Sequence, residues 1–201
     1  VDKQGAWLRI ARARQQGEVI GAENGLNFPD SKIVLPILND DDLNALECAV
    51  EIADIVGLSF VQSAEDIDKL GAELHARGRS GGESIGHGAG GQAFGVMSAR
   101  GDLAVEIGYD RLAEIQEEIL WLCEAAHVPV IWATQVLESM VKQDIPSRAE
   151  ITDAAMAERA ECVMLNKGPY IFNALDVLDS VVSRMQHHQL KKTAQFRALH
   201  W

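Results

Sequence analysis

The chain has 201 residues, 47% of them hydrophobic, and a formal net charge of −12 at pH 7. This length and apolar content suffice to bury a core, so we expect a globular protein of one domain, or one and a fraction. The negative charge repels nucleic acid and anionic membrane surfaces and so argues against both as partners. No apolar run of about 18 residues and no secretory signal occur, and we therefore expect a cytoplasmic protein.

Short apolar runs alternate with amphipathic segments along most of the chain. Residues 1–32 are expected to lead into the core, with a short strand near residues 33–37. Four apolar runs predict buried strands at residues 54–60, 94–99, 128–133 and 162–165. Helices are predicted from Ser63, from Asp110 and after Pro169. Repeated strand and helix units predict a parallel α/β sheet covered by helices over residues 33–188, followed by a carboxyl-terminal tail at residues 189–201.

Residues 78–91 interrupt this alternation with a glycine-rich segment, GRSGGESIGHGAGG. It contains a formal GxGxxG motif at Gly86, Gly88 and Gly91, but that motif binds dinucleotides only when it follows a strand and opens a helix. Here it precedes a predicted strand. We therefore expect a flexible loop without a nucleotide.

Three cysteines, Cys48, Cys123 and Cys162, lie far apart in apolar segments. Their odd number and spacing do not match a disulfide framework or a CxxC metal site. We expect reduced thiols in the core.

Polar residues follow each predicted strand, where parallel sheets present their functional groups. These residues are Ser59 to Gln62, Arg100 to Asp102, Thr134 and Gln135, and Asn166 and Lys167. Each has a simpler explanation as a helix cap or turn residue, as the capping box Ser147 to Glu150 illustrates. Their convergence on one face of the sheet nevertheless favours a site.

Three segments resemble the later half of the catalytic barrel of the pyruvate kinase family. They are ARGDLAVEIG, PVIWATQVLESMVKQDIPSRAEITDAA and AECVMLNKGPY. The family patterns are ARGDLG(V/M)E, P(V/I)xxATQMLESM and P(T/S)RAE. ENGLNFPD is similar to the family's KGVNLPG, and details such as IWATQ and LNKGPY resemble a divergent bacterial branch. The resemblance implies a TIM (β/α)8-type barrel that binds phosphoenolpyruvate and pyruvate, here incomplete with about four or five βα units.

The same resemblance implies a phosphotransferase that makes pyruvate and ATP from phosphoenolpyruvate and ADP, with Mg²⁺ or Mn²⁺ and commonly K⁺. Thr134 and Arg100 are then expected to be catalytic, with Thr134 beside the enolate. The backbone from Ala99 through Gly101, together with Asp102 and Thr134, would bind the substrate. Asp102 would be the metal ligand, because hard cations prefer carboxylate oxygens.

The sequence also departs from the family pattern. The family's KIE motif supplies a Lys for the transferring phosphoryl group and a Glu for the metal, and no KIE occurs in this chain. We therefore expect weak or no kinase activity. The alternatives are a non-catalytic assembly or interaction module and an oxo-acid lyase on the same barrel, the latter by fold analogy alone. Because a partial barrel leaves strand edges uncovered, we also expect a homo-oligomer.

Overall fold

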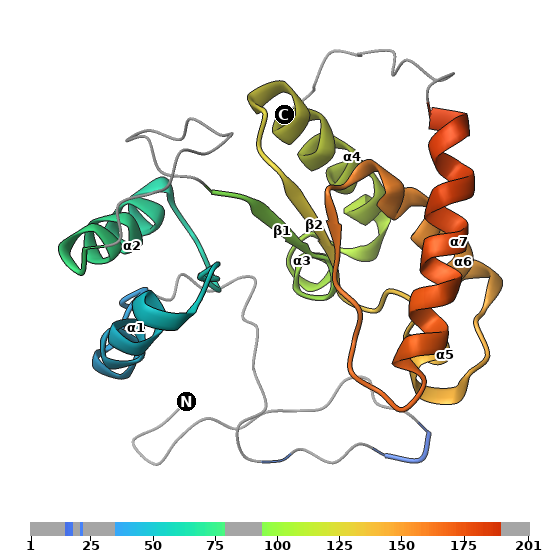
Figure 1. Ribbon diagram of the computed structural model, residues 1–201, viewed down its shortest axis with the longest axis horizontal. Helices are drawn as coiled ribbons and strands as arrows, with labels where there is room; N and C mark the ends of the chain where they lie inside the picture. Colours follow the sequence, from blue (N-terminus) through green and yellow to red (C-terminus); the bar gives the residue numbers. More distant parts are fainter. Residues whose placement is uncertain (1–14, 18–20, 22–34, 79–93, 190–201) are drawn as a thin grey trace. The chain divides into compact units, whose positions relative to one another are not determined.

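A computed structural model describes residues 15–17, 21, 35–78 and 94–189 of the chain. The chain divides into two units, Val1–Ile33 and Val34–Trp201. The helices and strands described below belong to the second unit (Figure 1). Most of the expected amino-terminal segment at 1–32, most of the glycine-rich loop at 78–91 and nearly all of the tail at 189–201 lie outside the described residues.

Residues 35–78 contain two helices, α1 (Asp40–Ile52) and α2 (Ala64–Ala76). Asn39 begins α1 with a capping box to Asp42, whose carboxylate accepts a hydrogen bond from the Asn39 N–H at 2.9 Å. The predicted helix from Ser63 is confirmed as α2, and at its start the Asp66 carboxylate accepts hydrogen bonds from the backbone N–H groups of Gln62 and Ser63. Local capping therefore accounts for both helix starts.

The predicted strand at residues 54–60 is wrong, because these residues form irregular backbone between α1 and α2. Ile55 and Phe60 are 80% and 75% exposed. A strand is stable only when its backbone groups pair with a neighbour, and among the described residues nothing pairs with this segment. The short strand expected near residues 33–37 is also absent over its described part, residues 35–37.

Residues 94–189 form a three-stranded parallel sheet in the order β1 (Val96–Ala99), β2 (Val130–Ala133) and β3 (Cys162–Val163). Val96 pairs with Val130 and Ile131 pairs with Cys162, so consecutive strands are neighbours. The three later strand predictions are thus confirmed, each with trimmed ends. The sheet confirms a parallel α/β fold, while closure into a barrel and the number of units stay predictions.

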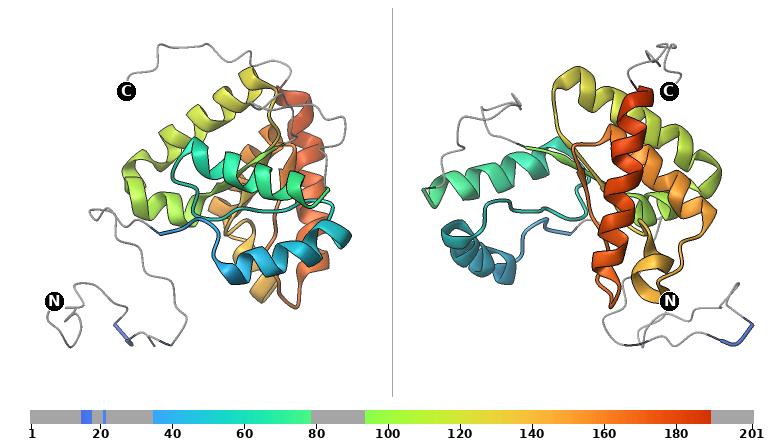
Figure 2. Two further views of the ribbon diagram at one scale, coloured as in Figure 1. Left: turned by 90° about the vertical axis from the view of Figure 1, so that its left-hand side faces the viewer. Right: turned by 45° about the vertical axis from the view of Figure 1, so that its right-hand side comes forward.

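Helices connect and cover these strands (Figures 1 and 2). Between β1 and β2 lie α3 (Arg100–Ile107) and α4 (Tyr109–Ala126). After β2 come α5 (Glu138–Gln143), α6 (Arg148–Met156) and the short 3-10 helix η1 (Ala157–Arg159), and α7 (Ile171–Gln189) follows β3. Helix α7 packs against α5, α6 and η1. The predicted helices after Asp110 and Pro169 are therefore confirmed.

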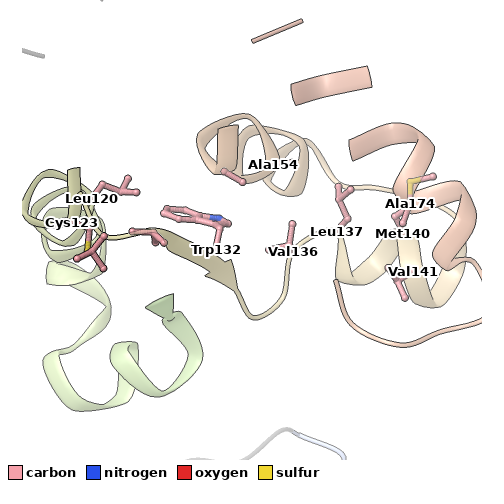
Figure 3. Packing of buried hydrophobic residues seen from close by; sticks show 12 residues of the cluster. Leu120, Cys123, Trp132, Val136, Leu137, Met140, Val141, Ala154 and Ala174 are labelled. Carbon is pink, nitrogen blue, oxygen red and sulfur yellow. The ribbon is translucent and has the colours of Figure 1, made fainter. Parts of the chain in front are cut away.

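The core of this segment centres on β2 and on the turn that follows it. Trp132 is 1% exposed, and Val136, Leu137 and Val141 are fully buried. Figure 3 shows Trp132 between Leu120 of α4 and Ala154 of α6. Burial of these side chains joins α4, the sheet and α6 into one packed structure, which fixes the ends of β1 and β2 relative to each other.

Burial differs from the sequence expectation at several positions. Leu122 of α4 and Leu175 of α7 are apolar residues of predicted helices, yet they are 48% and 52% exposed. Among the cysteines only Cys123 is buried, whereas Cys48 and Cys162 are exposed, so the core prediction is wrong for two of the three. Burial raises the pKa of the Cys123 thiol, and the Glu161 charge adds to this effect.

No helix in the described part of the chain is long and apolar enough to cross a membrane.

Candidate functional site

The carboxyl ends of β1 and β2 open onto one cavity of about 470 Å³. Arg100 and Gly101 follow β1 directly, and Thr134 and Gln135 follow β2 directly. The remaining lining residues come from α3, α4, α5, α6 and the N-cap of α6: Ala104, Tyr109, Leu112, Glu138, Ser139, Ser147, Ala149, Glu150 and Asp153. The structure therefore brings together two of the four polar strand ends that the sequence predicts to converge.

The turn after β2, residues 134–137, has an unusual backbone. Thr134, Gln135 and Leu137 have positive φ angles of 66°, 58° and 48°. This left-handed region is costly for side chains other than glycine, and for a β-branched residue such as Thr134 it is a clear outlier. Such conformations persist only where surrounding contacts hold them, and they gather at functional sites. We call residues 134–137 the site turn.

Thr134 and Gly101 connect the two strand ends directly. The Gly101 N–H donates a hydrogen bond to Thr134 Oγ1 at 3.0 Å. Gly101 lies within helix α3, and a Cβ built on it would lie 3.8 Å from Thr134 Oγ1, an ordinary contact. Close packing in this structure therefore does not by itself require glycine at this position.

The Arg100 side chain is held in place by two backbone carbonyls, a carboxylate and an aromatic ring. Its Nε donates to the Ala133 carbonyl at 2.9 Å, and its Nη2 donates to the Thr134 carbonyl at 2.7 Å. The guanidinium also forms a two-point ion pair with the Asp153 carboxylate and lies over the Trp132 ring, 4.5 Å from its centre. With its side chain only 10% exposed, Arg100 bridges the end of β2 to α6.

Glu150 connects the start of α6 to α5, which follows the site turn. Its carboxylate accepts hydrogen bonds from the Ser139 N–H at 2.5 Å and the Ser147 N–H at 2.8 Å. Partial burial raises the pKa of the Glu150 carboxyl, but the hydrogen bonds from Ser147 and Ser139 outweigh burial and leave the pKa below its ordinary value. The predicted capping box at Ser147 is confirmed and also contacts α5.

Asp102, the predicted metal ligand, lies exposed in the first turn of α3 and is not among the cavity-lining residues. Ala99, which was also predicted to bind substrate, is the N-cap of the same helix. Within the described ranges, no three His, Cys, Asp or Glu side chains gather in a way that could hold a metal ion.

Two predicted strand ends do not reach the cavity. Ser59 to Gln62 follow no strand, and neither they nor Asn166 and Lys167 line it. Gly168, which follows Lys167, packs tightly against Val141, because a Cβ built on Gly168 would lie 2.5 Å from Val141.

Asp153 is a functional candidate that the sequence analysis missed. It lies three residues after Glu150, a spacing that places both carboxylates on one face of α6. This spacing was the available signal, but the capping box alone explained Glu150 and left Asp153 without a role.

Comparisons with known proteins give a consistent result. Residues 91–171 match the family model of the pyruvate kinase barrel domain. The chain is 33% identical to pyruvate kinase PKLR of Homo sapiens over 197 residues, covering 88% of this chain and 34% of that protein. It is 34% identical to the pyruvate kinase of Methanocaldococcus jannaschii, covering 90% and 44%. A crystal structure of a pyruvate kinase from Cryptosporidium parvum superposes with a TM-score of 0.70 at 31% identity, over 80% of this chain and 38% of that one.

Proposed function

Because the chain belongs to the pyruvate kinase family, as part of its barrel domain, we propose that the cavity at the ends of β1 and β2 is a remnant of that family's phosphoenolpyruvate site. The chain spans about 34% to 44% of the length of the relatives described above. A barrel domain of this family supports a pyruvate kinase-like function, and the substrates, cations and turnover of this chain are part of the proposal.

The observation that carries the proposal is the meeting of Gly101 and Thr134. Two residues 33 positions apart are joined by one hydrogen bond at the carboxyl ends of adjacent parallel strands, beside a cavity. These are the residues to which the family resemblance assigns the substrate carboxylate and the enolate. Strained backbone at Thr134 supports the same assignment, because such strain is typical of ligand sites.

A divalent cation fits this site only when the substrate supplies most of its ligands. Asp102 does not itself line the cavity, but it follows the lining residue Gly101 directly and would contribute one carboxylate from the cavity's edge. Mg²⁺ is commonly held by one or two carboxylates together with substrate phosphate oxygens. When bound, the cation would neutralise phosphoryl charge. K⁺, which the family resemblance also implies, stays part of the proposal without assigned residues in this chain.

Transfer of the phosphoryl group would break its bond to the enol oxygen of phosphoenolpyruvate and form a bond to ADP, and the enolate would then take a proton at carbon to give pyruvate. Thr134 is proposed to lie beside that enolate. Arg100 was expected to be catalytic, and its contacts favour a positioning role, because its guanidinium is engaged by Asp153 and two backbone carbonyls. With no KIE Lys, turnover is expected to be very low or absent.

The proposal is tested by titrating phosphoenolpyruvate into the chain in the presence of Mg²⁺, alongside a coupled assay of pyruvate formation from phosphoenolpyruvate and ADP. Binding should weaken by about tenfold or more in Thr134→Val, which removes the hydroxyl, and Asp102→Ala should weaken the Mg²⁺ dependence of binding. Asp144→Asn, an exposed carboxylate hydrogen-bonded to Asn173, is the control and should bind like the parent chain. Equal binding by the parent and Thr134→Val would remove the assignment.

Self-association is a second part of the proposal. Within the described residues, β1 is an edge strand and its Met97 side chain is 48% exposed. Unpaired edges with apolar side chains recruit other strands. Light scattering should therefore give a mass above 21.9 kDa, and a stable monomer would refute this part.

A further inference from the structure

We propose that α6 is the positioning element of the site, with Asp153 and Glu150 holding both sides of the strained site turn so that the Thr134 hydroxyl keeps its place. The inference rests on the proposed function in one respect, namely that Thr134 contacts the ligand. The arrangement of the turn stands on the contacts of the described residues alone.

The first contact set holds the beginning of the site turn. The Asp153 carboxylate accepts hydrogen bonds from both terminal nitrogens of Arg100. Arg100 also donates hydrogen bonds to the carbonyl groups of Ala133 and Thr134. A planar guanidinium reaches two carbonyls and a carboxylate at once because its donors are fixed in one fork. Trp132 stacks on this fork and directs its Nε1–H toward the Asp153 carboxylate at 3.3 Å. Asp153 therefore acts on the turn through Arg100.

The second contact set holds the chain just beyond the site turn. Glu150 accepts from the N–H of Ser139, in the first turn of α5, while it also caps α6 at Ser147. Glu150 and Asp153 thus attach one short helix to the chain before and after residues 135–137. Three left-handed residues cannot relax to ordinary φ angles without moving one of these two attachments.

The consequence falls on the Thr134 hydroxyl. Its oxygen accepts the Gly101 N–H at 3.0 Å, so its place depends on the position of the Thr134 backbone relative to α3. Loosening the Arg100 bridge frees the Thr134 carbonyl and lets the backbone rotate away from the left-handed region. The Gly101 amide then loses its acceptor, which gives a local signal that does not require any ligand.

The experiment compares Asp153→Asn with a matched control, Glu117→Gln. Glu117 forms an ion pair with Arg159 that resembles the Arg100 pair in exposure, with side chains 31% and 20% exposed against 26% and 10%. Glu117 lies on α4 and does not line the cavity. The amide proton resonance of Gly101 is followed by NMR, with Thr134→Val as the reference for a lost hydrogen bond, and phosphoenolpyruvate affinity is measured with Mg²⁺ present.

In Asp153→Asn we expect the Gly101 amide to move in the direction seen in Thr134→Val, and affinity to fall on the order of tenfold. Glu117→Gln should leave both unchanged, although it also loses an ion pair. Should Asp153→Asn fail to fold, Glu150→Gln provides the second test and should move the same amide. An unmoved Gly101 amide in a folded variant, or an equal movement in Glu117→Gln, overturns the inference. Movement of the amide in a chain that binds no phosphoenolpyruvate upholds the positioning role and removes the proposed function.

Discussion

The two long described segments, residues 35–78 and 94–189, have similar local sequence signals and different degrees of burial. Both contain amphipathic helices with acidic first turns and capping boxes. Yet the buried cluster found among the described residues is drawn wholly from residues 94–189, whereas Leu46 is the buried apolar side chain described in residues 35–78. The difference shows that capping starts a helix, while pairing of parallel strands is what gives its apolar face something to cover.

The variants Trp132→Ala and Phe60→Ala give the strongest test of this difference in burial between the two segments. Trp132 is almost fully buried at the centre of the packed segment, so its removal should lower the free energy of unfolding by about 3–5 kcal/mol. Phe60 is 75% exposed, and its removal should change stability by no more than about 0.5 kcal/mol. Urea denaturation measures both. Equal losses would mean that residues 35–78 contribute to the core as much as the sheet does.

A second pair of variants replaces one glycine in each segment, Gly168 and Gly57, with alanine. A methyl group at Gly168 would meet Val141 at 2.5 Å, including a backbone oxygen, so Gly168→Ala should cost about 1–3 kcal/mol through overpacking. At Gly57 nothing lies within 4 Å of such a methyl group, and Gly57→Ala should be neutral or slightly stabilising. Thermal unfolding of the two variants gives the measurement. A destabilised Gly57→Ala would show that this part of the first segment is packed more closely than its contacts indicate.

These contrasts also explain how far the sequence could predict the fold. The strands at 94–99, 128–133 and 162–165 were found because each apolar run has a parallel neighbour in the same segment. The run at 54–60 has an equally apolar sequence but no pairing partner among the described residues, and apolar composition alone cannot report on a partner.

The site was predictable in part for a related reason. Arg100, Gly101 and Thr134 could be expected because they stand at strand ends, where the topology gathers polar groups. Their hydrogen-bond partners could not, since the contact of Arg100 with Asp153 joins residues 53 positions apart. The left-handed backbone of Thr134 was equally hidden, because threonine ordinarily avoids it.

The smallest expected effect concerns two carboxylates that accept backbone N–H groups at helix starts, Asp66 of α2 and Glu150 of α6. The hydrogen bond from the Gln62 N–H is the largest influence on the pKa of Asp66 and, with that from Ser63, lowers it against the opposing effect of burial. For Glu150, burial is the largest influence, but the bonds from Ser147 and Ser139 together outweigh it and lower the pKa. A carboxyl with a lowered pKa in the folded state stabilises that state above the unfolded pKa of about 4, and the contribution is lost as the pH falls through the folded value.

The variants Asp66→Asn and Glu150→Gln should therefore differ from the parent chain at pH 7 and converge with it as the pH falls below the ordinary carboxyl pKa and through the lowered pKa of the folded state. The two should still behave differently from each other. Asp66 bonds only to residues three and four positions away, so Asp66→Asn should reduce helicity in α2 and leave the unfolding midpoint of the sheet nearly unchanged. Glu150 also holds Ser139 in α5, 11 positions away, so Glu150→Gln should lower that midpoint as well. Circular dichroism against pH and temperature separates these outcomes, and a sheet midpoint that responds equally to both variants would contradict a purely local role for Asp66.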